Sequence, residues 1–395
     1  MRILTVCTST NVFGAEVVTL KMLDGFQRAG HEQLAVTSIW TDGEFNRRLA
    51  CLGIQEVRLP FGAFSKRIAV RPLWWTINTA ARLPWLWFGW LRIVRRFQPE
   101  FIIFTSSRLA LPVYPILEHD RGFLIEHGYL EPTPIRRRVY QLFASKLIGF
   151  FAVSDFMGRQ LHVLGAPKSQ IFVVKNGVFS ASEFPQISNR TFVANQTVKI
   201  GIVGQISQRK GHEILLEAVR VLREQDVRLQ VLVFGAGDAS YVSEISRKVS
   251  AYELSDFWRW MGYLGSPDEI YPKFDICVMP TITPEPFGMV AAEAGAFGLP
   301  VIVANCGGLT EVVDHGITGF LVEPGSPIEL AERIKWLMEN PQEARAMGLK
   351  GRDKVFQEFT QERMVSEFEQ VFDDANRKLY GRDRISDANG GSTFT

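Results

Sequence analysis

The sequence predicts an α/β protein with two domains, each built on a parallel sheet. The chain has 395 residues, which is more than a single hydrophobic core usually spans. Strand-like apolar runs alternate with helical patterns in both halves, and this alternation is typical of a parallel sheet covered by helices. A polar stretch at 180–196, shortly after the turn signal Asn176-Gly177, separates the two alternations. We take this stretch as the linker between the domains.

The N-terminal domain is expected to cover residues 1–179 with a Rossmann-like fold. Short apolar runs predict its strands, and apolar residues three and four positions apart predict its helices. The expected strands are 2–7, 33–38, 101–105, 122–126 and 149–153, and the expected helices include 14–28 and 85–97.

The C-terminal domain is expected to cover residues 197–360 with the same architecture. The expected strands are 198–203, 229–234, 257–261, 275–280, 300–303 and 319–322. The expected helices are 211–224, 266–272, 288–297, 326–339 and 341–357. A last helix, about 361–380, has Met364, Phe368 and Phe372 on its apolar side. The small polar residues of the tail, 386–395, predict disorder.

The bulk composition narrows the class of protein. A hydrophobic content of 46% and a charged content of 22% indicate a globular chain, and the net charge of +2 argues against a dedicated nucleic-acid binder. The four cysteines have no CxxC spacing and do not cluster with the histidines, so no metal site is predicted. Cys7 and Cys277 lie in apolar runs, which favours buried thiols in a reducing compartment. The first residues enter a strand without a signal segment, so we expect a cytoplasmic protein.

A basic, tryptophan-rich block at 66–96 contains five of the nine tryptophans. Residues 61–140, which include it, have 12 basic and 5 acidic side chains. Arg82 and Pro84 interrupt the apolar run, so we do not interpret it as a membrane span. Two interpretations stay open: an amphipathic helix pair packed inside the N-terminal domain, or a surface that contacts an anionic membrane.

The segment from Pro284 to Glu293 brings two acids and a helix start together. It follows a buried strand that ends at Pro280 and leads into an alanine-rich helix. Gly288 leaves the first helical turn without a side chain, so an anion can approach the N–H groups there, while Glu285 and Glu293 can accept hydrogen bonds from hydroxyls. An anionic ligand with hydroxyls fits this pattern. The plainer interpretation makes Glu285 a neighbour of the helix N-cap and Glu293 a solvated helix residue.

Four further segments follow predicted strands and carry candidate site residues. Arg209-Lys210 stands before a helix, where it is either an anion site or a solvated pair of cations. Gly235 belongs to a GxG turn, and Gly14 follows Phe13 at the start of the first long helix; both fit a plain tight turn as well as a ligand site. His127 ends a strand next to a glycine, a more suggestive position than those of His119, His162, His212 and His315, which we assign to the surface or to helix caps.

The stretch from Glu285 to Val322, with Gly307-Gly308 and Glu311 at its centre, resembles the nucleotide-sugar site of the family-four retaining glycosyltransferases of group 1. The resemblance covers nearly the whole chain. It implies the GT-B fold, in which two Rossmann-like domains face a central cleft and a C-terminal helix crosses back to the N-terminal domain. The N-terminal domain would then hold the acceptor and the C-terminal domain the donor.

The resemblance also implies roles for the candidate residues. Glu293 would bind the ribose, and Glu285 with the backbone at Phe287 and Gly288 would hold sugar hydroxyls. Lys210, Arg209 and the helix N-terminus at Gly288-Met289 would stabilise the diphosphate, and His127 would lie against the sugar. Gly14 would meet the phosphate or the acceptor, and Gly235 would border the nucleotide. The chain departs from the family pattern in having Gln205 where arginine is common and Phe13 where a glycine is usual.

The function implied by the resemblance is retaining transfer of a sugar from a nucleotide diphosphate sugar to a glycan or lipid-linked acceptor, in cell-surface polysaccharide or glycolipid synthesis. No cofactor and no metal are implied, and the chain has no Asp-x-Asp pair of the metal-dependent kind. Two alternatives stay open. One is a sugar phosphorylase or epimerase of the same fold, and the other is a catalytically silent scaffold subunit that binds nucleotide sugars.

Overall fold

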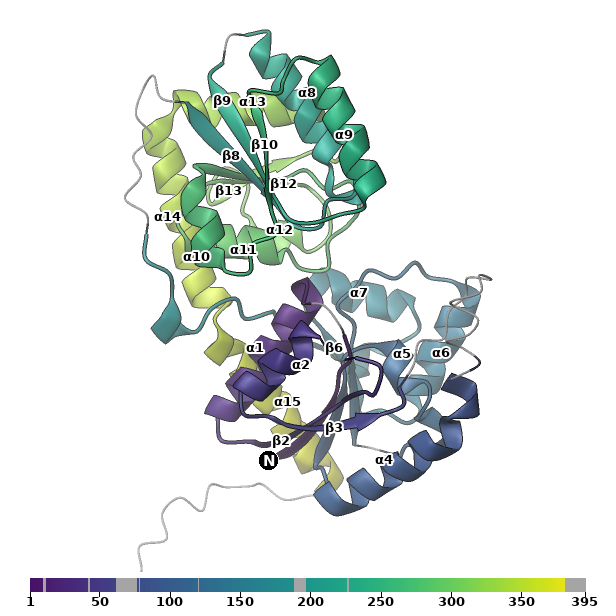
Figure 1. Cartoon of the computed structure of the whole chain (residues 1–395). Helices are drawn as coiled ribbons and strands as arrows, with labels where there is room; N and C mark the ends of the chain where they lie inside the picture. The colour runs from purple at the N-terminus through teal and green to yellow at the C-terminus, as the bar shows by residue number, and fades with distance from the viewer. Residues whose placement is uncertain are drawn as a thin grey trace, which may run out of the picture. The chain divides into compact units, whose positions relative to one another are not determined.

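The computed structural model describes residues 1–9, 12–41, 43–61, 77, 79–119, 121–187, 197–225 and 227–380. The chain divides into two compact units (Figure 1). Unit 1 consists of Met1–Val153, Gly158–Val174 and the chain from Glu362 onward, and unit 2 consists of Ser154–Met157 and Lys175–Gln361. Three parts of the sequence analysis lie outside the described residues: Trp74 and Trp75, the end of the predicted linker at 188–196, and the predicted disordered tail.

Unit 1 is built on a parallel sheet of seven strands in the order β3-β2-β1-β4-β5-β6-β7. The strands are β1 Arg2–Val6, β2 Glu32–Ser38, β3 Gln55–Leu59, β4 Phe101–Phe104, β5 Gly122–Ile125, β6 Gly149–Ala152 and β7 Ile171–Val173. The sequence analysis did not predict β3 and β7, which are the two edge strands of this sheet. β3 has only Leu59 buried and β7 has no buried residue, so neither has the apolar run of an inner strand.

The helices of unit 1 connect these strands and cover the sheet (Figure 1). They are α1 Gly14–Arg28, α2 Glu44–Cys51, α4 Leu83–Phe97, α5 Ser107–Ala110, η1 Tyr114–Ile116, α6 Pro134–Ala144, α7 Asp155–Val163 and η2 Lys168–Gln170, with α7 shared between the units. α4 begins two residues before the predicted start because Pro84 lies in its first turn, where the missing N–H costs no helical hydrogen bond.

The C-terminal helix α15, Gln361–Tyr380, packs on unit 1 (Figure 1). The Phe372 ring stacks on Phe101 of β4 at a centroid distance of 4.6 Å. The Phe368 ring meets Phe151 of β6 edge-on, also at 4.6 Å. These rings are buried, so the apolar side of α15 is part of the hydrophobic core of unit 1. The predicted return of this helix to the N-terminal domain is confirmed.

Unit 2 is built on a parallel sheet of six strands in the order β10-β9-β8-β11-β12-β13. The strands are β8 Val198–Val203, β9 Leu229–Phe234, β10 Trp258–Gly262, β11 Ile276–Met279, β12 Val301–Ala304 and β13 Gly319–Val322. The helices are η3 Ala181–Glu183, η4 Gln208–Lys210, α8 His212–Arg223, α9 Ala239–Ala251, α10 Pro267–Ile270, η5 Tyr271–Lys273, α11 Met289–Ala296, α12 Leu309–Val312, α13 Pro327–Glu339 and α14 Pro341–Glu358. α8 packs on α13, and α11 packs on α14. The predicted pair of parallel α/β sheets is confirmed.

The parallel sheets determine where the candidate residues lie. In unit 1, Gly14 and His127 follow β1 and β5, and in unit 2, Lys210, Gly235 and Glu285 follow β8, β9 and β11. Strands of a parallel sheet have their carboxyl ends at one edge, and that edge is where α/β proteins bind ligands. Each unit therefore gathers its own candidates at a single edge of its sheet.

Candidate functional site

The loop between β8 and α8 places Lys210 beside the end of β11. Gly211 is the N-cap of α8 and has a φ of 74°. A Cβ atom at Gly211 would lie 1.8 Å from the carbonyl oxygen of Pro280, so only glycine allows the two backbones to approach this closely. This approach brings Lys210 to Glu285 although the two residues are 75 positions apart.

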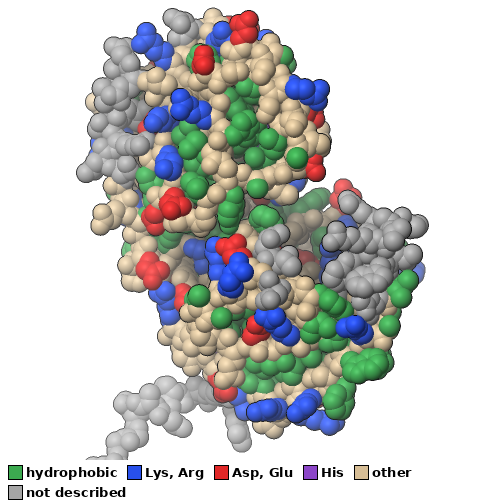
Figure 2. All heavy atoms as spheres, in the orientation of Figure 1, with side chains coloured by type: hydrophobic (Ala, Val, Ile, Leu, Met, Phe, Trp, Pro, Cys, Tyr) green, Lys and Arg blue, Asp and Glu red, His purple; other side chains and the backbone are tan. Residues whose placement is uncertain are grey.

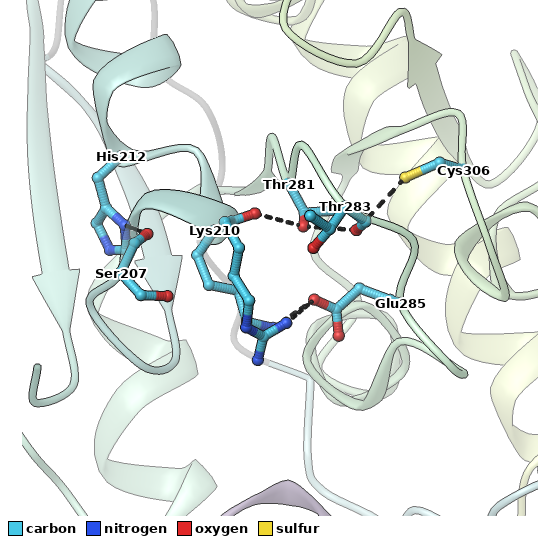
Figure 3. A network of polar contacts seen from close by, with 8 residues as sticks. Ser207, Lys210, His212, Thr281, Thr283, Glu285 and Cys306 are labelled. Atoms are coloured by element: carbon cyan, nitrogen blue, oxygen red, sulfur yellow. Dashed lines mark hydrogen bonds and ion pairs between the residues drawn. The ribbon is translucent and has the colours of Figure 1, made fainter. Parts of the chain in front are cut away.

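Glu285 is the centre of a charged cluster (Figure 3). Its Oε1 accepts hydrogen bonds from Lys210 Nζ at 2.7 Å and from Arg209 Nη1 at 3.1 Å. The Glu285 and Lys210 side chains are 11% and 15% exposed, whereas the Arg209 side chain is 46% exposed. Two cations around a single carboxylate leave a net positive charge, and an anionic ligand can use it. The sequence proposed these residues separately, and the structure brings them together.

The Glu285 backbone is held by the Gly307-Gly308 pair. Gly308 N donates to Glu285 O at 2.7 Å. A Cβ at Gly307 would lie 2.4 Å from Glu285 O, and a Cβ at Gly308 would lie 2.5 Å from Pro286 O. The two glycines therefore allow a second chain segment to lie directly against the Glu285 loop and to hold its position.

Thr281 is a member of this site that the sequence analysis missed. It is fully buried, and its Oγ1 donates to Arg209 O at 2.8 Å and lies 3.0 Å from Thr283 O (Figure 3). Ile282 N donates to the same Arg209 carbonyl at 2.9 Å. These contacts attach the Arg209 backbone to the segment that leads to Glu285. The signal available in the sequence was a threonine directly after a predicted strand that ends at Pro280.

The N-terminus of α11 begins next to Glu285. Gly288 is its N-cap with a φ of 120°, and a Cβ there would lie 2.7 Å from Leu309 Cδ2. The helix starts at Met289 without a side-chain cap, so its first N–H groups are suited to an anion. Phe287 is 2% exposed and packs edge-on against Phe359, which leaves its backbone, and not its ring, for a ligand.

Glu293 is not the solvated helix residue of the plainer interpretation. It is half-buried, and its Oε2 accepts a 2.6 Å hydrogen bond from the Tyr271 hydroxyl. Burial and the nearby carboxylate raise the pKa of Tyr271, so the phenol stays protonated and donates. Tyr271 was missed because it lies 22 positions before Glu293, in a short helical turn with no motif of its own.

Gly235 at the end of β9 is required by packing. Its φ is 140°, and a Cβ there would lie 1.8 Å from the carbonyl oxygen of Gly204. The two glycines thus allow the loops after β8 and β9 to touch. This contact explains Gly235 without a ligand and also places its backbone at the carboxyl edge of the sheet.

In unit 1, Gly14 starts α1 in open space. A Cβ there would meet no atom within 4 Å. Phe13 precedes it as the N-cap, is 51% exposed, and donates its backbone N–H to Glu16 Oε2 at 3.0 Å. Chain packing therefore does not require glycine at position 14, unlike positions 211 and 235.

His127 follows β5, and burial lowers the pKa of its imidazole to about 4, so the ring is neutral at pH 7. Its Nε2 is buried and has no hydrogen-bond partner within the described chain. The preceding Glu126, which the sequence analysis did not single out, is buried and accepts from Ser107 N at 2.7 Å and from the Tyr140 hydroxyl at 2.8 Å. These bonds hold the end of β5, and burial raises the pKa of the Glu126 carboxyl.

His212 corrects one prediction of the sequence analysis, because it is 1% exposed and not a surface residue. Burial lowers the pKa of its imidazole to about 4. An unfolded histidine has a pKa near 6.5, so below that pH the unfolded chain gains a proton that buried His212 does not take up. The free energy of unfolding is therefore expected to fall between pH 6.5 and about 4, by up to about 1.4 kcal/mol per pH unit for this residue.

Urea unfolding of the protein and of His212→Asn at several pH values in this range measures that loss. The variant is expected to lose less stability per pH unit than the parent, because asparagine does not titrate. An equal slope in the two proteins would contradict the assignment. His127, whose pKa is also lowered to about 4, contributes in the same direction and remains present in both proteins.

Two features are absent from the residues that the structure describes. No group of three or more histidine, cysteine, aspartate or glutamate side chains is arranged to hold a metal ion there. Among the same residues, no helix has both the length and the apolar character needed to cross a membrane.

Comparison with known proteins assigns the class. The family model described as glycosyltransferase family 4 matches residues 12–180, and the model described as glycosyl transferases group 1 matches residues 183–354. The structure of HepE from Anabaena in complex with UDP superposes with a TM-score of 0.79 at 20% identity, covering 95% of this chain and 100% of HepE. Two parallel α/β sheets with a C-terminal helix on the first define the GT-B fold. The chain belongs to the family-four glycosyltransferases.

Curated relatives match over shorter stretches. N-acetyl-alpha-D-glucosaminyl L-malate synthase of Bacillus anthracis is 26% identical over 238 residues, which are 58% of this chain and 61% of that protein. D-inositol 3-phosphate glycosyltransferase of Pseudarthrobacter chlorophenolicus is 27% identical over 240 residues, 58% of this chain and 56% of the relative. The match thus spans less than two thirds of either relative.

Proposed function

We propose that the protein transfers a hexose-type sugar from a uridine diphosphate sugar to a hydroxyl of a glycan or lipid-linked acceptor. The observation that carries the proposal is the cluster of Arg209, Lys210 and Glu285 at the carboxyl edge of the unit 2 sheet, next to the N-terminus of α11. The uridine nucleotide is supported by similar folds, since HepE has been solved with UDP-glucose and TarM of S. aureus with UDP.

In this proposal the diphosphate replaces part of the Glu285 contacts. Lys210, Arg209 and the N–H groups at Gly288 and Met289 stabilise the negative charge that develops as the leaving group departs. These groups supply the positive charge from the chain itself, so we propose that no metal is required. Glu285, freed in part from its cations, accepts hydrogen bonds from the sugar hydroxyls, as does the backbone at Phe287.

The nucleoside end of the donor is assigned to Glu293 and Gly235. Glu293 accepts hydrogen bonds from the ribose, and the Tyr271 hydroxyl holds its carboxylate in place. Gly235, at the carboxyl edge of the sheet, is assigned a place beside the nucleotide. In unit 1 the proposal assigns His127 to the transferred sugar, because the neutral ring and its buried Nε2 suit a hydroxyl partner, and Gly14 to the phosphate or the acceptor.

We propose retention of the anomeric configuration by attack on the same face from which the diphosphate departs. The acceptor oxygen bonds to the anomeric carbon, the bond from that carbon to the diphosphate breaks, and a leaving phosphate oxygen takes the acceptor proton. No carboxylate nucleophile is needed in this step. Glu285 serves as a hydrogen-bond acceptor throughout.

The acceptor is proposed to belong to cell-surface polysaccharide or glycolipid synthesis. Relatives with such names include the capsular polysaccharide glycosyltransferase CapM of Staphylococcus aureus, which is 27% identical over 197 residues, 48% of this chain and 49% of CapM. A cytoplasmic location, peripheral to the inner face of the membrane, is part of the proposal.

Glu285→Gln is expected to reduce donor turnover by about 100-fold, because the amide keeps the shape but loses the charge that orients Lys210 and the sugar hydroxyls. Proton NMR of the anomeric signal of uridine diphosphate glucose measures slow donor hydrolysis by the parent and by the variant. The same signal measures sugar transfer when an acceptor extract is added. A product of inverted configuration would contradict the mechanism. Isomerised donor, or sugar phosphate released without acceptor, would favour the epimerase or phosphorylase alternative, and a parent as inert as the variant would favour the silent scaffold.

A further inference from the structure

The outward face of α4 has a composition that its packing does not explain. Its inward side is buried through Leu86, Trp90 and Val94. On the outside, Trp85 and Phe88 are 70% and 71% exposed, so two large aromatic side chains of this helix face solvent. The sequence left two interpretations open, packing inside the domain and contact with a membrane. Packing explains only the inward side of α4.

Three arginines extend the same outward stripe. Arg92, Arg95 and Arg96 are exposed and follow Phe88 at intervals of three and four residues, the spacing of one helical face. Within the described residues none of the three is paired with an acid. The outer stripe of α4 is thus aromatic in its N-terminal half and cationic in its C-terminal half.

Neighbouring elements of unit 1 enlarge this surface. Trp87 Nε1 of α4 donates to Pro112 O at 2.8 Å, and the Tyr114 hydroxyl donates to Leu142 O of α6 at 3.0 Å. These two bonds connect α4 to α6 through the segment after α5. Exposed apolar side chains lie on the connected elements as well: Leu111 at 42%, Ile135 at 65% and Leu142 at 53%.

The charge of these elements has one sign. α4 has three arginines, α5 has one and α6 has three, and none of the three helices has an aspartate or a glutamate. Figure 2 shows apolar and basic side chains side by side at the end of unit 1 where Figure 1 places α4. A surface with exposed tryptophan, phenylalanine and unpaired arginine matches the phosphate and acyl boundary of an anionic bilayer.

We propose that this face, formed by the outer side of α4 with the adjoining parts of α5 and α6, docks on an anionic membrane surface. Trp85 and Phe88 insert at the headgroup level, and Arg92, Arg95 and Arg96 bind lipid phosphates. The charged side chains of α4, α5 and α6 are all arginines, so this face fits a partner that is negatively charged over its whole surface, as an anionic bilayer is. Docking there holds unit 1 at the membrane, where a lipid-linked acceptor is found.

Vesicle flotation of the full chain tests the proposal. The protein is mixed with vesicles of phosphatidylglycerol and phosphatidylcholine, and separately with vesicles of phosphatidylcholine alone. Binding to the anionic vesicles is expected, together with a loss of binding at high salt, because salt screens exposed charges. Inorganic phosphate, added at the same concentration as the lipid phosphate, should not compete with the vesicles for the protein. This result would distinguish a lipid surface from a site for free phosphate.

Two sets of substitutions locate the surface. Charge reversal at Arg92, Arg95 and Arg96 to glutamate is expected to lower the affinity at least about tenfold, since each basic residue contributes to the attraction. Trp85→Ser with Phe88→Ser is expected to weaken binding by a factor that changes little with salt, because salt does not screen the apolar contact. The matched control is a variant of unit 2 with Ile328→Ser, Arg247→Glu and Arg345→Glu. The native side chains at these three positions are exposed, that of Ile328 by 62%, so this variant should bind like the parent.

Calorimetric binding of uridine diphosphate verifies that each variant is folded and keeps its donor site. A parent protein that does not float with anionic vesicles would overturn the proposal. So would variants of the α4 face that bind the vesicles as well as the parent does.

Discussion

Replacing Lys210 by alanine is expected to reduce sugar transfer by about 100- to 1000-fold, the loss typical of a group that stabilises charge in a transition state. Lys210 Nζ lies 2.7 Å from Glu285 Oε1, and its side chain is only 15% exposed. The change removes the less exposed cation of the cluster and leaves Glu285 with Arg209. Steady-state kinetics with a uridine diphosphate sugar measure the effect, which is expected mainly in kcat.

A double substitution separates the loss of charge from damage to the fold. Lys210→Ala alone also leaves the largely buried Glu285 carboxylate with one cation fewer, which destabilises unit 2. Lys210→Ala with Glu285→Gln removes both members of the pair, so it should regain thermal stability without regaining activity. Arg209→Ala should have a smaller effect on transfer, because the Arg209 side chain is 46% exposed and makes the longer contact of 3.1 Å. Equal losses at Arg209 and Lys210 would contradict the assignment of Lys210 as the principal cation.

Gly211→Ala is expected to have the largest effect on stability, about 3–5 kcal/mol. The residue has a φ of 74°, and its Cβ would lie 1.8 Å from Pro280 O. Pro280 belongs to the backbone that ends β11, so the clash forces the Lys210 loop away from the Glu285 loop. Chemical unfolding is expected to show this loss, and donor binding is expected to weaken with it.

Gly316→Ala is the matched control in the same unit. Its φ is 75°, nearly that of Gly211, but a Cβ there would meet no atom within 4 Å. Only the cost of the left-handed backbone then remains, about 1–2 kcal/mol. If both variants lost the same stability, the close approach of the two loops could not be the reason for Gly211.

The elements that the sequence predicted best are those with an unbroken local pattern. β8, β9, β13 and α1 have the predicted bounds, because their apolar runs and spacing are complete within a single segment. The edge strand β3 lacked such a run, since only its last residue, Leu59, is buried, and its pairing with β2 is not visible in the local pattern. Local pattern therefore predicted all the strands of unit 2 and the inner strands of unit 1, and it failed at the two edges of the unit 1 sheet.

The candidate site shows the same division. Lys210, Glu285 and Glu293 could be proposed from motifs that follow predicted strands. Their partners could not, because the bond from Tyr271 to Glu293 and the bond from Thr281 to the Arg209 carbonyl depend on how loops meet in three dimensions. The second of these contacts lies beside the close backbone approach of Gly211 to Pro280, and no local spacing in the sequence encodes either contact.

The most direct test of the central claim is calorimetric titration of the full chain with uridine diphosphate and its sugars, in the presence of a chelator, compared with Lys210→Ala and Glu293→Ala. We expect the parent to bind without added metal and both variants to bind at least about tenfold more weakly, since each loses a charged hydrogen bond to the donor. A folded parent that binds none of these nucleotides, or variants that bind them as tightly as the parent, would contradict it.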